Sequence, residues 1–135
     1  NANLDFTLLN IANGTFAGAA DLSGLPYRAS ASVVPASDFY VGTYDGDASA
    51  TAIQDAIMSN TQPAGLVSTN AAGDWNLAAY LAAQYDAGAV AGDFVFLRVN
   101  SNQLDHLPYR YWHLATADNS TVENRPVLSI EIGAE

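Results

Sequence analysis

Apolar and polar residues alternate along several short stretches of the chain. Leu4, Phe6 and Leu8 occupy every second position of residues 4–9, with polar residues between them. Successive side chains of a strand point to opposite faces, so this pattern predicts a half-buried β-strand. Comparable patterns predict strands over residues 29–34, 39–44, 66–69, 94–100, 109–115 and 127–132, whereas residues 10–24 predict a long loop or a weak strand near residues 15–16. The side chains of the last strand that are predicted to face the core are Leu128, Ile130 and Ile132.

Two stretches change to a helical spacing. Ile53 and Ile57 lie four positions apart and predict a short helix over residues 49–60. A second helix is predicted to begin at Asn76, its N-cap, and to end at Gly88. Its apolar face is Leu77, Tyr80, Leu81 and Gln84. Trp75, at the start of this helix, is predicted to lie in the core. The residues before it, 71–73, predict a turn. The strand over residues 94–100 is apolar on both faces, which is typical of a central, covered strand. Together these elements predict an all-β antiparallel sandwich with two short helices in its connections.

The composition fits one domain and excludes some partners. The 135 residues are enough for a single core over residues 1–135. Fourteen acidic residues oppose four basic ones, all arginine, and the net charge is −10. Such a chain offers no basic patch to replace the counterions of phosphates, so we expect neither nucleic acid nor an anionic membrane surface as a partner. No apolar run approaches the length of a membrane span, so membrane insertion is not expected. The acidic surface favours solubility, with divalent-cation binding or a salty habitat as alternatives.

The sequence contains no recognisable catalytic or zinc-binding motif. The two histidines, His106 and His113, lack zinc-ligand spacing, and cysteine is absent. A nucleophile elbow, a P-loop and a dinucleotide-binding glycine motif are all missing, so we do not expect an enzyme. Asp45-Gly46-Asp47 is typical of a turn. The alternative is that Asp45 and Asp47 help to hold a structural calcium ion, the one cofactor that we consider.

The aromatic segment over residues 109–114 is the strongest candidate for a binding site. If Trp112 faces the core, Tyr109, Tyr111 and His113 lie on the opposite face of the strand. Flat rings with polar tips suit stacking on sugar rings. Arg110 would share the core side near the strand end, where an aspartate could pair with it. The competing interpretation is that these rings simply fill a covered strand.

The order of three segments resembles a known family. Residues 75–81 read Trp-Asn-Leu-Ala-Ala-Tyr-Leu, residues 92–98 read Gly-Asp-Phe-Val-Phe-Leu-Arg, and residues 125–132 read Arg-Pro-Val-Leu-Ser-Ile-Glu-Ile. This order is similar to that in the C-terminal half of DNRLRE-type jelly-roll domains, a family of secreted bacterial β-sandwich modules that includes carbohydrate-binding modules. The resemblance implies a jelly-roll fold, an extracellular location and polysaccharide as the ligand. The family's first strands have no counterpart here. The chain is therefore a fragment, or residues 10–34 replace those strands, or a neighbouring subunit supplies them.

Two functions follow from these observations. The first is a secreted, non-catalytic module that binds extracellular polysaccharide through Tyr109, Tyr111, His113 and Arg110. The second is a structural subunit of an extracellular fibre or matrix that assembles with copies of itself by strand complementation, since a sandwich without its first strands exposes an open sheet edge. In that case residues 1–9 are expected to be the donor strand.

Overall fold

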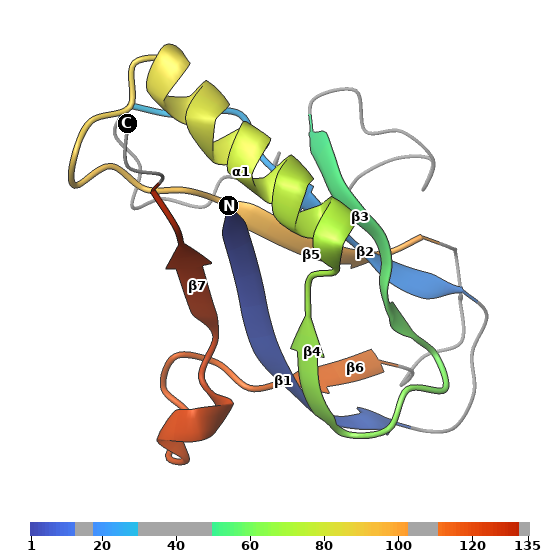
Figure 1. Ribbon diagram of the computed structural model, residues 1–135. Helices are drawn as coiled ribbons and strands as arrows, with labels where there is room; N and C mark the ends of the chain where they lie inside the picture. Colours follow the sequence, from blue (N-terminus) through green and yellow to red (C-terminus); the bar gives the residue numbers. More distant parts are fainter. Residues whose placement is uncertain (13–17, 30–49, 103–110, 133–135) are drawn as a thin grey trace.

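The computed structural model describes residues 1–12, 18–29, 50–102 and 111–132, which form two antiparallel sheets and one α-helix (Figure 1). The expectation of a mostly β protein is therefore confirmed. The elements, in chain order, are β1 (Ala2–Ala12), β2 (Ala19–Gly24), β3 (Thr51–Ser59), β4 (Gly65–Ser68), α1 (Ala71–Asp86), β5 (Leu97–Ser101), β6 (Tyr111–Leu114), the short 3-10 helix η2 (Val122–Asn124) and β7 (Val127–Ile130). The strand predicted over residues 39–44 and nearly all of that over 29–34 lie outside the described residues.

Strand β1 is the centre of the first sheet. Its residues Asp5–Leu8 pair with β4, and Asp5 and Leu8 also pair with β7 and β6 respectively. Strands β6 and β7 therefore share the edge of β1 opposite β4, one at each end of β1 (Figure 1). The predicted alternation is confirmed, because Leu4, Phe6 and Leu8 are buried. Of the segment expected to be the donor strand, residues 5–8 pair with β4 on one edge, and residues 2–5 and Leu8 pair with β7 and β6 on the other. Its donation to another copy of the chain stays a prediction.

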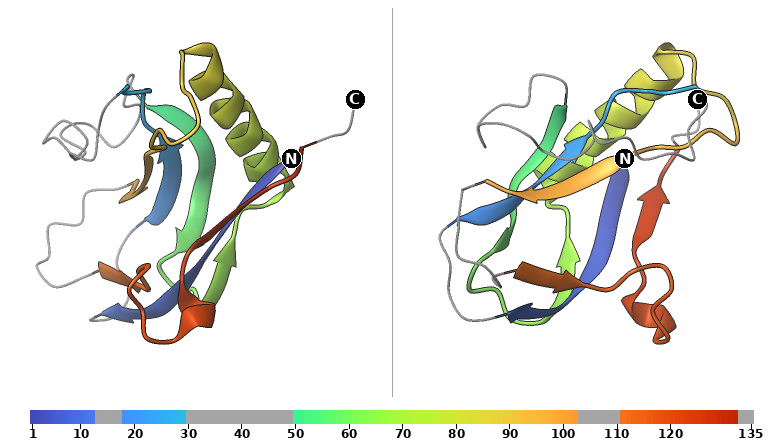
Figure 2. Two further views of the ribbon diagram at one scale, coloured as in Figure 1. Left: turned by 90° about the vertical axis from the view of Figure 1, so that its left-hand side faces the viewer. Right: turned by 180° about the vertical axis from the view of Figure 1, so that it is seen from behind.

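The second sheet has the order β3-β2-β5. Strand β2 occupies part of the predicted loop over residues 10–24, and Ala20 and Leu22 from it are completely buried. Strand β5 was predicted to be central and covered, but it pairs only with β2 in the described part of the chain and its residues are half-buried. Figure 2 shows the two sheets on either side of the core, with α1 lying across one end.

The helix predicted over residues 49–60 is wrong, because this segment is strand β3. Ile53 and Ile57 are both buried, as the pattern required. A spacing of four residues is one turn of a helix but also two periods of a strand, so it does not separate the two structures. The strand bulges near Ala56, whose φ is +49°, and the Ala56 amide donates to Asp21 Oδ1 at 2.7 Å.

Helix α1 begins earlier than predicted. Asn70, not Asn76, is the N-cap, and its side chain accepts a hydrogen bond from the Gly73 amide at 2.9 Å. The turn predicted at residues 71–73 is therefore helical. The helix ends just before Gly88, which has a φ of +104° and matches the predicted stop. The predicted buried face is confirmed: it consists of Leu77, Tyr80, Leu81 and Gln84, together with Gly73.

Tyr80 attaches α1 to the second sheet. Its ring lies against Gly24, and its hydroxyl lies 2.7 Å from the carbonyl oxygen of Leu25 and 3.0 Å from that of Phe96. The helix packs chiefly on β1 and β3, one strand from each sheet. The core therefore lies between the two sheets and beneath α1.

Strand β7 extends the first sheet beyond the reach of α1. Ala2 and Leu4 of β1 pair with Ile130 and Leu128, which places these four side chains on one face of the sheet. The β1 residues are buried, but Leu128, Ile130 and Ile132 are 39%, 56% and 91% exposed. The expectation that these three side chains face the core is therefore wrong: α1 covers β1, and no described element covers β7 to the same extent.

Candidate binding surfaces

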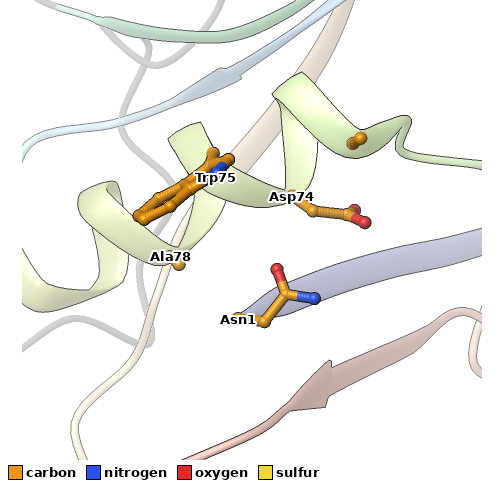
Figure 3. Close-up of a pocket in the computed structure, with 5 residues that line it drawn as sticks. Asn1, Asp74, Trp75 and Ala78 are labelled. Carbon is orange, nitrogen blue, oxygen red and sulfur yellow. The ribbon is translucent and has the colours of Figure 1, made fainter.

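Trp75 stands on the solvent side of α1 and is 78% exposed, so the expectation that it belongs to the core is wrong. It lies two residues before the buried Leu77, which is about 200° around a helix and places it on the opposite side. Its indole lines a hollow of about 350 Å³ (Figure 3). The residues around this hollow are Asn1, Ala71, Asp74, Trp75 and Ala78.

The carboxylate of Asp74 is held in a fixed position at this hollow. Asn3 Nδ2 donates to Asp74 Oδ1 at 3.1 Å, and the Thr69 hydroxyl donates to the same oxygen. The Thr69 hydroxyl in turn accepts from Asn3 Nδ2 at 3.0 Å and from the Leu4 amide at 3.1 Å. Because both bonds to Asp74 end on Oδ1, Oδ2 has no partner among the described residues and keeps its capacity to accept a hydrogen bond.

A larger apolar groove continues from this hollow along α1. It has a volume of about 520 Å³ and shares Asn1 and Ala78 with the hollow beside Trp75. We name it the α1–β7 groove. It is lined by Asn1, Ala2, Ala78, Leu81, Ala82, Gln84 and Tyr85, then by Ala89, Val90, Asp93, Phe94 and Val95, and on the β7 side by Leu128, Ile130, Glu131 and Ile132. Trp75 to Tyr85 spans ten residues of helix, so the two hollows together follow α1 for roughly 15 Å.

The charged side chains of the α1–β7 groove, Asp93 and Glu131, are both acidic. Asp93 Oδ2 accepts from the Val90 amide and from the Tyr27 hydroxyl, each at 2.9 Å. The hydrogen bond from Val90, followed by that from Tyr27, holds the pKa of Asp93 below its ordinary value, because both bonds favour the ionised form. The hydrogen bond between Tyr27 and Asp93 also raises the pKa of Tyr27. Asp93 therefore keeps its negative charge at neutral pH.

The aromatic segment that the sequence favoured lies on β6, at the other end of β1. Tyr111 and His113 are exposed, whereas Trp112 and Leu114 pack against the core, as the alternation predicted. Trp112 Nε1 donates to the carbonyl oxygen of Ser59 at 3.1 Å, which fixes the face that the strand presents. Tyr111 pairs with Ala12, whereas the Trp75 hollow lies beside Asn1, so the two surfaces are separate (Figure 1). Tyr109 and Arg110 lie outside the described residues.

The described residues contain no cluster of three or more His, Cys, Asp or Glu side chains that could hold a metal ion. Asp45 and Asp47, the candidate calcium ligands, lie outside the described residues, so that hypothesis is not tested. Among the described residues, no helix is both long enough and apolar enough to cross a bilayer.

Comparisons of the chain with protein-family models, with curated proteins and with solved structures find no match. The resemblance to DNRLRE-type domains is carried by the sequence motifs alone. The structure adds Trp75 and Asp74 to the candidate residues. The signal for Trp75 was available in the sequence, because a residue two positions from Leu77 cannot share its face of a helix. The position of Asp74 beside Asn3 and Thr69 depends on the tertiary fold.

Proposed function

We propose that this chain is a secreted, non-catalytic module that binds a neutral extracellular polysaccharide. The observation that carries the proposal is the exposed indole of Trp75, which shares a hollow with the side chains of Asp74 and Asn1. A solvent-exposed aromatic ring of this size favours binding of a ligand that has both an apolar face and polar edges. Sugar rings have this character.

Each side chain of the hollow has a separate role in this proposal. The indole of Trp75 stacks on the C–H face of a sugar ring. Asp74 Oδ2 accepts a hydrogen bond from a sugar hydroxyl, and the Asn1 amide both donates and accepts. Asp74 already accepts two hydrogen bonds from the protein, so its side chain is fixed before the ligand arrives and loses no further conformational entropy on binding. An anionic polysaccharide is disfavoured, because Asp74 and the net charge of −10 repel it.

The exposed rings of Tyr111 and His113 on β6 form a second surface with the same chemistry. We retain it as the alternative site for the same function. In this proposal the two sheets are the layers of a jelly-roll sandwich, as the resemblance implies, and no catalytic residues or metal are required.

The test is affinity electrophoresis of the 135-residue chain in native gels that contain a soluble neutral polysaccharide. Hydroxyethyl cellulose, xylan, galactomannan and mixed-linkage β-glucan are run in parallel with a gel that lacks polysaccharide. We expect retardation in at least one gel, loss of that retardation in Trp75→Ala, and no change in Tyr111→Ala. Val122→Ala is the control, because Val122 is 62% exposed and belongs neither to the Trp75 hollow nor to β6.

Circular dichroism of each variant shows whether the fold is retained. Retardation that is lost in Tyr111→Ala and kept in Trp75→Ala would move the site to β6. An unretarded parent chain in all gels would refute polysaccharide binding of this class.

A further inference from the structure

We propose that the outer edge of β7, together with the α1–β7 groove, binds an extended strand of a basic partner protein. The partner strand adds to the first sheet beside β7, places apolar side chains in the groove, and carries lysine or arginine near its ends. This site lies apart from β6, and it requires no sugar.

At two positions of β7 the backbone groups point away from β1. The Glu131 amide donates to the Asn1 carbonyl oxygen at 2.8 Å, and the Asn1 nitrogen lies 3.1 Å from the Glu131 carbonyl oxygen. In an antiparallel ladder such bonded pairs alternate with non-bonded ones, so Ser129 and Val127 also bond toward β1. The N–H and C=O groups of Leu128 and Ile130 therefore point away from β1, and no described residue meets them.

The side chains of these same residues open onto an apolar surface. Leu128 and Ile130 line the α1–β7 groove, which is bounded on its far side by the last turns of α1 and the segment after it. Three large apolar side chains of that wall are well exposed: Tyr85 by 68%, Val90 by 66% and Phe94 by 54%. An added strand would bond to the free edge through its backbone and would place every second side chain in the groove. Strand β7 has four residues, so the partner strand needs about four or five residues, or roughly 15 Å.

Charge identifies the occupant as a basic protein rather than a second copy of this chain. The two charged side chains of the groove, Asp93 and Glu131, are both acidic. Two copies of the chain, each with a net charge of −10, repel each other as they approach. A strand with lysine or arginine at its ends instead places cations next to Asp93 and Glu131, which favours both encounter and register.

The probe is a synthetic nine-residue peptide, blocked at both ends, that alternates valine with threonine and carries lysine at each end. Its binding to the 135-residue chain is followed by fluorescence anisotropy of a dye on the peptide. The control peptide has glutamate in place of both lysines. We expect saturable binding of the lysine peptide, binding at least tenfold weaker for the glutamate peptide, and weaker binding of the lysine peptide as salt is raised.

Two variants locate the site. Ile130→Pro removes the outward N–H and leaves the bonds between β7 and β1 in place, because proline is tolerated where the amide of an edge strand faces outward. Phe94 lines the groove and lies outside the described strands, so Phe94→Arg introduces a cation into the groove without changing a strand residue. Each should weaken binding of the lysine peptide by roughly tenfold or more. Ser129→Ala is the matched control on β7, because the backbone groups of Ser129 face β1. This variant should bind the lysine peptide with the same affinity as the parent chain.

Three results would overturn the proposal. The lysine peptide does not bind, or it binds the Ile130→Pro and Phe94→Arg variants as tightly as the parent chain. Alternatively, sedimentation velocity finds that the chain alone self-associates and that Ile130→Pro abolishes the association, in which case a second copy occupies the edge.

Discussion

The contact between Gly24 and Tyr80 gives a sharp prediction about stability. Gly24 ends β2, and a Cβ added there would clash with three ring carbons of Tyr80: Cε2, which is the nearest, and Cδ2 and Cζ at 2.5 Å each. The ring cannot easily retreat, because Tyr80 is 3% exposed and its hydroxyl is anchored on the Leu25 and Phe96 carbonyl oxygens. Gly24→Ala must therefore displace α1 or break this anchor.

The expected loss in the free energy of unfolding is about 3 kcal/mol. Overpacking of a core costs about 1–3 kcal/mol, and loss of the hydroxyl anchor adds about 1 kcal/mol. For a domain of this size a loss of that magnitude lowers Tm by roughly 10 °C. Urea unfolding, followed by far-ultraviolet circular dichroism, measures the change in free energy, and thermal unfolding measures Tm.

Gly73→Ala is the matched control. A Cβ at Gly73 would meet mainly the amide end of the Gln54 side chain, with Gln54 Cδ at 3.2 Å and Gln54 Cβ at 3.3 Å, and the flexible amide can move aside. Movement costs the hydrogen bond that Gln54 Oε1 accepts from the Asn70 amide, but alanine gains about 1 kcal/mol of helix propensity over glycine. We expect a net change within about 1 kcal/mol.

A double-mutant cycle separates the clash from other effects. Tyr80→Leu removes the ring, so Gly24→Ala should cost much less in that background than in the parent chain. If Gly24→Ala changes the free energy of unfolding by less than about 1 kcal/mol, or costs the same with and without the Tyr80 ring, the packing argument is wrong.

Three further predictions rest on single side chains. Tyr80→Phe keeps the ring but removes the hydroxyl that contacts the Leu25 and Phe96 carbonyl oxygens, so the free energy of unfolding in urea should fall by about 1–2 kcal/mol. An unchanged urea midpoint would contradict the role of this hydroxyl as an anchor. Asn70→Ala removes the N-cap of α1 and should cost about 1 kcal/mol, whereas Asn70→Asp should cost little. The folded-state pKa of Asp93 is depressed, so its contribution to stability is present above the unfolded pKa of about 3.9 and is lost as the pH falls through the lower folded value. A carboxyl midpoint at or above 3.8 in an NMR titration of Asp93, or one that Tyr27→Phe leaves unmoved, would contradict this assignment.

Part of the candidate surface was predictable from the sequence. The alternation over residues 111–114 placed Tyr111 and His113 on the exposed side of β6 and Trp112 on the core side, and the structure confirms this. The environment of Trp75 was predicted wrongly, because it was inferred from the position of the residue at the start of the helix and not from its phase relative to Leu77. The α1–β7 groove has no local signal at all, since its walls come from three segments that are distant in the chain, within residues 1–2, 78–95 and 128–132.

The sequence by itself determined those elements whose hydrophobic spacing fits only one type of secondary structure. Strict alternation defined β1, and the helical recurrence of Leu77 and Leu81 defined the buried face of α1. The tertiary structure decided the rest. Ile53 and Ile57 fit a helix and a strand equally well, and pairing with β2 made the segment a strand. Alternation also marks one face of β7 as apolar, but burial requires a second element to cover that face. Such coverage is a non-local property, which is why this apolar strand is exposed beside α1.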